Sequence, residues 1–292
     1  MTLRDDFYAS ARAQIASGDI DPMYPVLRRF YEAERCEREV ALWRTLLYVT
    51  WYHVGSASLV WRRIPEPRPL TEGDVRGLST GTERRGFRGN VIAATHVNAL
   101  LALAQKAGGL ARFVDGLVGD GGETGWARTR EALQVVAWLG PWASYKWADL
   151  LKHVHGAPIT ANDIGVGGNS ETAGPIPGMV RLTGENWREC ATNIGLQKRL
   201  LGEARDAGVP FDGLDQLETT LCDFNSLCKG GYYIGHDIDA QMDHLNVATE
   251  PGLWEARATS FESRYLGEHH DWFGVRKNLR PVYAKHQRLV VL

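Results

Sequence analysis

The residues best suited to chemistry lie in one short segment between two expected helices, Leu139-Gly-Pro-Trp-Ala-Ser-Tyr-Lys-Trp-Ala-Asp-Leu-Leu151. Its Gly-Pro pair breaks a helix that we expect to end at Trp138, and Ser144 is a suitable N-cap for the next helix. Backbone N–H groups at a helix start carry partial positive charge and can hold a phosphate. Lys146 then falls on the first turn. The pattern predicts a phosphate-binding hairpin that carries an amine; the alternative is an ordinary helix break with a solvated lysine.

A carboxylate follows this amine, since Asp163 comes 17 positions after Lys146. The stretch Tyr145-Lys-Trp-Ala-Asp149 resembles the lysine-bearing hairpin of the 8-oxoguanine branch of the helix-hairpin-helix DNA glycosylases, whose pattern runs G-x-G-x-K-x-A-D. The lysine, alanine and aspartate match. Trp142 and Ser144 stand where that pattern has its two glycines, which let a backbone approach phosphate closely.

The resemblance to these glycosylases implies roles for the matching positions. Lys146 and Asp163 become the catalytic amine and carboxylate. The hairpin side chains Trp142, Ser144 and Tyr145 become DNA contacts, with the aromatic rings available to stack on a base that has been turned out of the helix. For each aromatic side chain taken alone, a place in the hydrophobic core is the alternative.

An arginine-rich turn is the best candidate for binding an anion. Arg84, Arg85 and Arg88 lie in a Gly-flanked segment, and arginine binds phosphate oxygens in a bidentate manner. Between residues 62 and 88 there are seven arginines and four acidic residues, so the region is locally basic. We expect these three arginines to bind pyrophosphate or the DNA backbone; a solvated charged loop is the alternative.

A second polar cluster spans residues 230–244. Tyr233 and His236 are candidates for substrate binding, and Asp239 for positioning or deprotonating an amine nucleophile. Asp239 and Asp243 share one helix face, because they are four positions apart. Oxygen-rich clusters suit Mg²⁺, so a magnesium ion is conceivable here, although the metal requirement stays open. A helix start with acidic residues favoured by the helix dipole is the alternative.

The elements that must position these residues are helices. Few windows of the sequence alternate with period two, whereas apolar residues recur widely at helical spacing. Val40 to Tyr52 is apolar on nearly all sides and should be a central buried helix. Three alternate prolines make residues 64–69 a loop, and residues 156–184 read as irregular. Other helices are expected at residues 3–15, 24–36 (with Asp21 as N-cap and Pro22 at the first position), 91–107, 110–118, 124–138, 185–207, 214–227 and about 237–247.

We therefore predict an all-α protein. Residues 1–292 are read as a single helical domain, or as two interleaved lobes with a hairpin lobe at about 90–184, and the glycosylase resemblance implies helical lobes around a cleft. The net charge of −2 gives no global basic signature, so nucleic acid must be met by a local patch. The four cysteines form no C-x-x-C pair, which favours free thiols. With no signal peptide and no long apolar run, we expect a cytoplasmic protein without a membrane partner.

A second resemblance covers most of the chain. The segments Gly18-Asp-Ile-Asp-Pro-Met-Tyr-Pro25, Leu46-Leu-Tyr-Val-Thr-Trp-Tyr52 with Gly55-Ser56, Gly81-Thr-Glu-Arg-Arg-Gly86 and Gly174-Pro-Ile-Pro-Gly178 resemble the phage alpha-glutamyl/putrescinyl thymine pyrophosphorylases, also called amino acid:DNA transferases. This family is regarded as distantly related to the DNA glycosylases. The resemblance implies thymine hypermodification in an infected bacterial cell. The amine of a free amino acid or polyamine would replace the pyrophosphate of a modified uracil in double-stranded DNA.

Two versions of such a reaction are open. In one, Lys146 adds covalently to C6 of the base; in the other, Asp163 stabilises charge on it. Three rivals also stay open: a glycosylase or lyase that cuts the N-glycosidic bond, a DNA-binding protein without catalysis, and a helical enzyme with no nucleic-acid role. The product separates the first rival, because a glycosylase leaves abasic DNA whereas a transferase leaves a heavier base.

Overall fold

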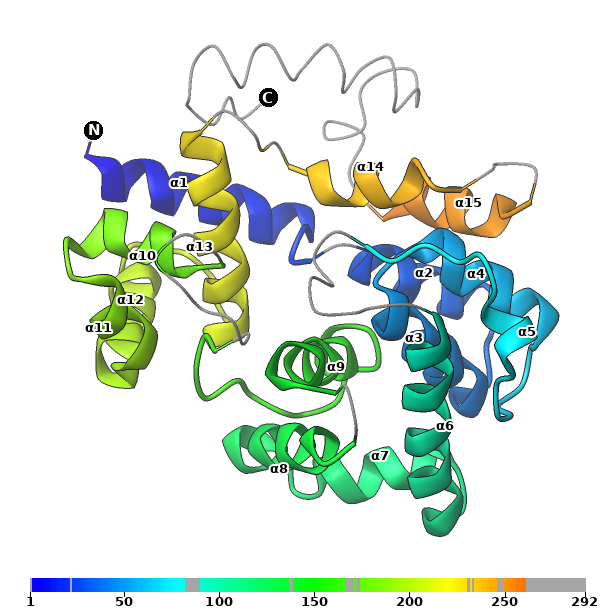
Figure 1. Ribbon diagram of the computed structural model, residues 1–292. Helices are drawn as coiled ribbons and strands as arrows, with labels where there is room; N and C mark the ends of the chain where they lie inside the picture. Colours follow the sequence, from blue (N-terminus) through cyan, green and yellow to red (C-terminus); the bar gives the residue numbers. More distant parts are fainter. Residues whose placement is uncertain are drawn as a thin grey trace. The chain divides into compact units, whose positions relative to one another are not determined.

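The chain folds into helices throughout its described part (Figure 1). This computed structural model describes residues 2–21, 23–81, 90–136, 139–165, 171, 174–229, 232, 234–245 and 249–260. Within those ranges there are fifteen helices, and the single β-type pairing is an isolated bridge between Gly122 and Ile159. The predicted all-α class is confirmed.

The chain forms two compact units, each assembled from separate segments. Unit 1 comprises residues 1–26, 161–240 and 255–292, and unit 2 comprises residues 27–160 and 241–254. Unit 1 contains α1 (Leu3–Ser17), α10 (Ile176–Thr183), α11 (Trp187–Thr192), α12 (Ile194–Asp206) and α13 (Leu214–Cys228). Unit 2 contains α3 (Arg38–Trp51), α4 (Val54–Arg63), α5 (Glu72–Val75), α6 (Asn90–Ala107), α7 (Leu110–Val118), α8 (Gly122–Gln134) and α9 (Pro141–His153).

Three further helices contain the boundaries between the units: α2 (Tyr24–Ala33), α14 (His236–Met242) and α15 (Pro251–Thr259). The boundary at residue 160 falls inside the hairpin lobe expected at 90–184, so that lobe does not coincide with either unit. The number of independently folding domains stays a prediction.

The core of unit 2 is built around α3. Nearly every residue of this helix from Ala41 to Trp51 is buried, and the helix packs against α4, α6, α7 and α9. A helix that is apolar on all sides can only be satisfied by burial on all sides. The predicted central helix is confirmed, with its start at Arg38.

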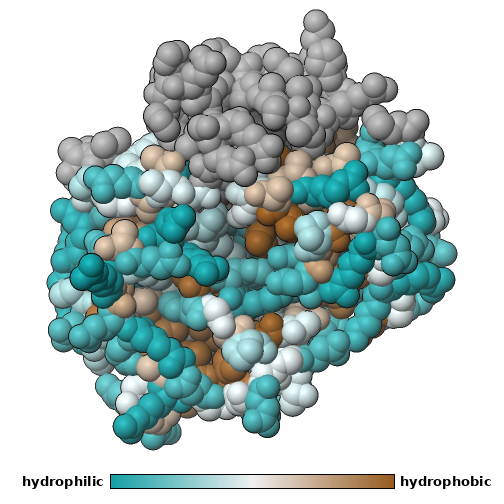
Figure 2. All heavy atoms as spheres, turned by 180° about the vertical axis from the view of Figure 1, so that it is seen from behind, coloured by the Kyte–Doolittle hydropathy of each residue, from teal (hydrophilic) through white to brown (hydrophobic). Residues whose placement is uncertain are grey.

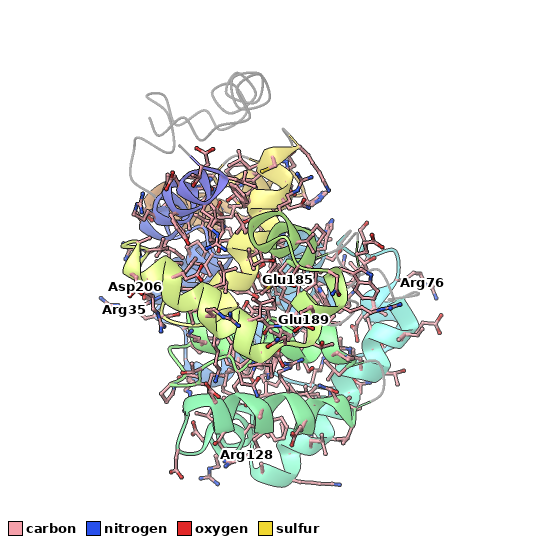
Figure 3. All side chains as sticks on the ribbon, turned by 90° about the vertical axis from the view of Figure 1, so that its left-hand side faces the viewer. Arg35, Arg76, Arg128, Glu185, Glu189 and Asp206 are labelled. Atoms are coloured by element: carbon pink, nitrogen blue, oxygen red, sulfur yellow. The ribbon has the colours of Figure 1, made fainter. Side chains whose placement is uncertain are left out.

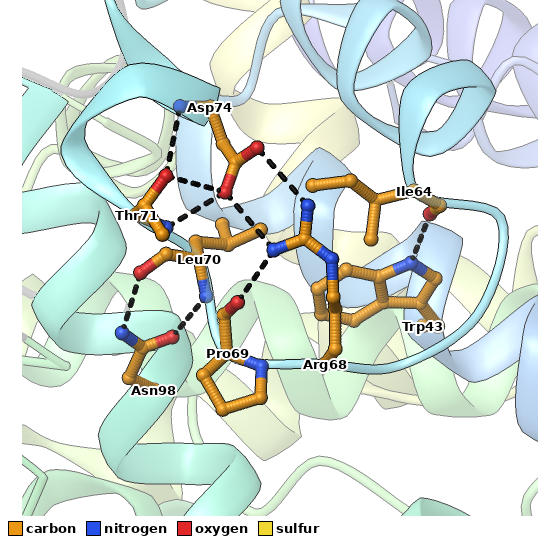
Figure 4. Close-up of polar contacts among 8 residues, drawn as sticks. All are labelled: Trp43, Ile64, Arg68, Pro69, Leu70, Thr71, Asp74 and Asn98. Carbon is orange, nitrogen blue, oxygen red and sulfur yellow. Dashed lines mark hydrogen bonds and ion pairs between the residues drawn. The ribbon is translucent and has the colours of Figure 1, made fainter.

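The proline-rich segment after α4 is a loop, as predicted, and polar contacts fix its course (Figure 4). The indole N–H of Trp43 donates to the carbonyl of Ile64 at 2.8 Å. The amide of Asn98 on α6 both accepts from the N–H of Leu70 and donates to its carbonyl. Arg68 pairs with Asp74, which also completes the capping box that starts α5. The loop is therefore held from α3, α5 and α6 at once.

Unit 1 is centred on α13, which packs against α1, α10 and α12. Phe7 of α1 meets Phe224 of α13 edge-on, with ring centroids 5.3 Å apart. A side chain at Gly178 of α10 would lie 2.1 Å from the carbonyl of Leu221, so only glycine permits the two helices to approach this closely. The close packing of α10 on α13 in this core therefore depends on Gly178.

Several predicted boundaries were wrong for identifiable reasons. Residues 156–184, read as irregular, contain α10. The helix expected at 185–207 is divided at Asn193, whose side chain caps α12 by accepting from the N–H of Leu196. Asp21 does not cap α2, because Met23 has a left-handed backbone (φ 69°) and the helix starts only at Tyr24. The helices α4, α5 and α15 were not predicted.

The exteriors of the helices are largely hydrophilic on the face drawn in Figure 2. Charged side chains such as Arg128 of α8 and Asp206 of α12 project from the helix surfaces (Figure 3). Within the described residues, no helix is both long and apolar enough to cross a membrane. The four cysteines are free, as expected.

Candidate functional site

The predicted hairpin is the turn between α8 and α9. Pro141 occupies the first position of α9 and Gly140 its N-cap, and the first intrahelical bond runs from the N–H of Ser144 to the carbonyl of Gly140. Proline is favoured at this position, since its missing N–H would have no helical partner. The prediction that Ser144 caps the helix was wrong: the helix begins three residues earlier.

A backbone clasp closes the far end of the hairpin. The N–H of Gly122 donates to the carbonyl of Pro158, and the N–H of Thr160 donates to the carbonyl of Gly122. The neighbouring Gly121 must be glycine, because its φ is +82° and a Cβ would lie 2.3 Å from the Pro158 carbonyl. The loop after α9 is thus tied to the first turn of α8, which makes the helix pair a rigid support.

Two of the three side chains expected to contact DNA lie in the interior. Ser144 and Tyr145 are fully buried. The ring of Tyr145 meets Trp126 of α8 edge-on at 5.1 Å, and Ser144 accepts from the side chain of Gln134. Trp142 is partly exposed and meets Tyr52 edge-on, with centroids 4.9 Å apart. DNA contact by these three stays a prediction, and burial argues against it for Ser144 and Tyr145.

Lys146 lies on the second turn of α9, not the first, and it is 5% exposed. Asp149 follows three positions later and His153 seven positions later, so the three side chains share one face of the helix. Asp149 is fully buried, and its Oδ1 lies 3.4 Å from Nε2 of His153. The sequence reasoning missed Asp149 and His153 as candidate site residues. The spacing of i, i+3 and i+7 from the lysine was the available signal.

Asp163 is part of unit 1, whereas Lys146 is part of unit 2. Asp163 is partly buried, and its Oδ1 accepts the N–H of Gly165 at 2.6 Å. A Cβ at residue 165 would lie 2.7 Å from that oxygen, so a larger residue here would require the Asp163 side chain to shift. The structure gives Asp163 a fixed orientation within its own unit; its pairing with Lys146 stays a prediction.

The elbow between α3 and α4, here residues 51–56, holds the start of the arginine-rich turn. Tyr52 is left-handed (φ 47°) although it is buried and not glycine, which is a strained backbone. The N–H of Gly81 donates to the carbonyl of Trp51 at 2.9 Å, and a Cβ at residue 81 would lie 2.0 Å from the carbonyl of Tyr52. Arg84, Arg85 and Arg88 themselves lie outside the described residues. Their anion-binding role stays a prediction.

Polar side chains stabilise this elbow. Gln241 bridges it, since its amide donates to the carbonyl of Tyr52 and accepts from the N–H of Val54. His53 caps α4 by accepting the N–H of Ser56 on Nδ1, and its ring stacks on that of His244 at 4.1 Å. Burial, and then the neighbouring His244, lower the pKa of His53 to about 4. His53 is therefore neutral at pH 7, with the ring proton on Nε2.

Unit 1 contains a carboxylate cluster of Asp19, Asp21, Asp223 and Asp237, of which the first three are buried and Asp237 is partly exposed. Asp19 accepts hydrogen bonds of 2.5 Å from the hydroxyl of Tyr232 and from the N–H of Gly235. The side chain of Gln14 donates to Asp223 at 2.5 Å. This cluster joins two segments singled out in the sequence, residues 18–25 and residues 230–244.

The electrostatics of this carboxylate cluster favour protonation of Asp223 or binding of a cation. Burial, and then the charges of Asp237, Asp19 and Asp21, raise the pKa of Asp223 well above its usual value. Burial, and then the charges of Asp19, Asp223 and Asp237, raise the pKa of Tyr232. His236 contacts Asp237 at 2.7 Å at the rim. Tyr233 lies outside the described residues, as does the side chain of Asp239, so their predicted roles are untested.

The predicted magnesium cluster includes Asp239, whose side chain lies outside the described residues, so the magnesium stays an untested prediction. Comparison with known families adds one finding. A family model described as amino acid:DNA transferase matches residues 70–233. The match covers more than half of the 292 residues and includes all of α6 to α13.

Proposed function

The chain belongs to the amino acid:DNA transferase family, and from that premise we propose that it replaces the pyrophosphate of a 5-(pyrophosphoryloxymethyl)uracil in DNA with the amine of an amino acid or polyamine. It is an enzyme that acts on DNA with an amino acid as the second substrate. The proposal adds three details to this statement: the modified uracil as target base, pyrophosphate as leaving group, and a polyamine as the alternative amine donor.

The observation that carries the proposal is the carboxylate cluster of unit 1, formed by Asp19, Asp21, Asp223 and Asp237. Amino acids and polyamines are ammonium ions near pH 7, and an ammonium ion is stabilised among carboxylates. The raised pKa of Asp223 makes its carboxylate a stronger base than an ordinary aspartate. Once an ammonium ion is bound, Asp223 can lose its own proton and then accept one from the amine.

The hairpin of unit 2 carries further groups that the proposed reaction needs. Lys146 is buried on α9 rather than solvated, which favours a chemical role over a surface role. The elbow at Tyr52 fixes Gly81 and with it the start of the segment that carries the three arginines. We assign Trp142, the partly exposed aromatic residue of the hairpin, to the flipped base.

The proposed reaction balances without an oxidant or a reductant. The amine nitrogen forms a bond to the exocyclic methylene carbon, and the bond from that carbon to the pyrophosphate oxygen breaks. Pyrophosphate leaves with the electron pair. The ammonium ion gives one proton to Asp223 before the bond forms, and the new C–N nitrogen gives a second proton to another carboxylate of the cluster or to the leaving pyrophosphate. In the covalent version, Lys146 first adds to C6 and is eliminated at the end; in the electrostatic version, Asp163 stabilises the charge on the base.

The test is mass analysis of nucleosides after the protein acts on DNA that carries the pyrophosphorylated base, with a mixture of amino acids and putrescine. We expect a heavier thymine derivative and one released pyrophosphate per modified base. Asp223→Asn should abolish transfer, because asparagine cannot accept the proton. The matched control is Asp206→Asn, an exposed aspartate of the same unit, which should leave turnover unchanged.

Three outcomes would contradict the proposal. Abasic DNA would identify a glycosylase. Binding of DNA with unchanged bases in every amine mixture would identify a non-catalytic protein. Transfer to unmodified thymine would retain the transferase and remove the pyrophosphate step.

A further inference from the structure

The inner face of α9 carries a carboxylate and an imidazole one turn apart. Asp149 and His153 are four positions apart on this helix, and their side chains are 1% and 10% exposed. Burying a charged carboxylate is costly unless it is paired or bound to a metal ion. A cation bound to both Asp149 and His153 would add to the stabilisation that the neighbouring side chains give this carboxylate.

The separation of the two ligand atoms fits coordination better than a direct hydrogen bond. Oδ1 of Asp149 and Nε2 of His153 lie 3.4 Å apart. Donors and acceptors in N–H···O bonds usually lie about 2.7–3.2 Å apart. Two atoms bound to one metal ion at about 2.1 Å lie about 3.0 Å apart across a right angle and about 3.4 Å apart across a tetrahedral angle.

Other histidines in the described part of unit 2 are engaged differently. Nε2 of His155 lies 2.9 Å from the hydroxyl of Thr45, and Nδ1 of His53 accepts the N–H of Ser56. Among these three, His153 has the one ring nitrogen placed beside a buried carboxylate. Because both ligands lie on one helix, the helix fixes their spacing before any ion arrives.

We propose that Asp149 and His153 hold a divalent transition-metal ion on the inner face of α9. A carboxylate with an imidazole suits Mn²⁺, Co²⁺ or Zn²⁺ better than Mg²⁺, which prefers oxygen ligands alone. Two protein ligands leave further positions on the ion for water or phosphate oxygens. The ion would lie about one helix turn from Lys146, so metal, amine and phosphate would share one face of α9. This inference does not depend on which base or amine is used.

The test uses the full-length protein after dialysis against a chelator, with Co²⁺ alone as the probe. We expect about one equivalent of Co²⁺ per chain, seen as a visible absorption band, and a rise in Tm on binding. Asp149→Asn and His153→Gln should each weaken binding by at least about ten-fold. Asp115→Asn and His244→Gln, which replace exposed residues, are the matched controls and should bind Co²⁺ like the wild type.

The wild type alone can overturn the proposal, whatever happens to the folding of the variants. Failure to bind Co²⁺, Mn²⁺ or Zn²⁺ near stoichiometric amounts, with no rise in Tm, would leave Asp149 and His153 as a plain ion pair. Unchanged binding in both folded variants, judged by circular dichroism, would place the ion elsewhere.

Discussion

Two regions of this protein bury carboxylates, and they differ in how the charge is compensated. On α9 in unit 2, Asp149 lies on a face that also carries the amine of Lys146 and the imidazole of His153. In unit 1, Asp223 lies among Asp19, Asp21 and Asp237, and its pKa is raised. The first carboxylate shares its helix face with an amine and an imidazole, whereas the second lies among other carboxylates that disfavour its charged form.

The difference assigns different chemistry to the two units. A charged carboxylate among cations can position an amine or a metal ion, as we propose for α9. A carboxylate with a raised pKa, such as Asp223, can exchange protons with a bound ammonium ion. An enzyme that joins an amine to a phosphorylated base needs both kinds of group.

Replacement of Lys146 should give the largest effect. Lys146→Ala is expected to lower the rate of transfer on the order of 10³-fold, within the range for loss of a direct catalytic group. Single-turnover transfer to modified DNA, with protein stability checked by urea unfolding, measures it. Full turnover by Lys146→Ala would eliminate the covalent version. Loss with Asp163→Asn alone would then leave the electrostatic version.

One substitution in each region should show whether the two buried carboxylates contribute differently to the free energy of unfolding. Asp149→Asn removes a charge that its neighbours need and should cost about 3–5 kcal/mol of stability. Asp223→Asn replaces a carboxyl whose raised pKa favours its neutral form, and the amide oxygen can still accept from Gln14, so stability at pH 7 should be unchanged or higher. Urea unfolding at pH 7 measures both. Equal losses would mean that the two carboxylates are compensated in the same way.

The sequence predicted the helical class and the central helix because burial on all sides leaves a continuous apolar stretch that can be read directly. It located the hairpin between the right helices but placed its start at Ser144, since a serine cap is a common signal and a Gly-Pro start is less so. It could not assign Ser144 and Tyr145 to the interior, because the partners Gln134 and Trp126 are contributed by another helix.

The carboxylate cluster of unit 1 shows more clearly that contacts between distant segments cannot be predicted from local sequence. Residues 18–25 and 230–244 were each singled out, but nothing in one segment reveals that Asp19 accepts from Tyr232. The raised pKa of Asp223 depends on three carboxylates, of which Asp19 and Asp21 lie about 200 positions away in the chain. Such a cluster is a property of packing, and local patterns cannot encode it.

Two glycines, one in each region, should respond differently to alanine. Gly178→Ala would place a Cβ 2.1 Å from the Leu221 carbonyl and should cost about 1–3 kcal/mol by overpacking α10 on α13. Gly140→Ala at the hairpin should be nearly neutral, because no atom lies within 4 Å of the new Cβ and φ is −64°. Thermal unfolding compares them. A large loss from Gly140→Ala would indicate that the hairpin needs glycine, as in the glycosylase pattern.

The smallest effects should appear in the pH dependence, with opposite signs in the two units. The folded state favours protonated Asp223, so its contribution to stability is full below the unfolded pKa of 3.8 and is lost as pH rises through the raised pKa. His53 has its folded pKa lowered to about 4, so its contribution is full above the unfolded pKa of 6.5 and is lost as pH falls toward 4.

The matched variants for this test are Asp223→Asn and His53→Asn, where the new asparagine can still cap α4. Relative to the wild type, Asp223→Asn should gain stability between pH 4 and pH 7. His53→Asn should gain it in the other direction, as pH falls from 6.5 to 4. Urea unfolding at each pH gives both curves. If Asp223→Asn lost stability relative to the wild type as pH rose, Asp223 would be ionised in the folded protein, and the two regions would compensate their carboxylates alike.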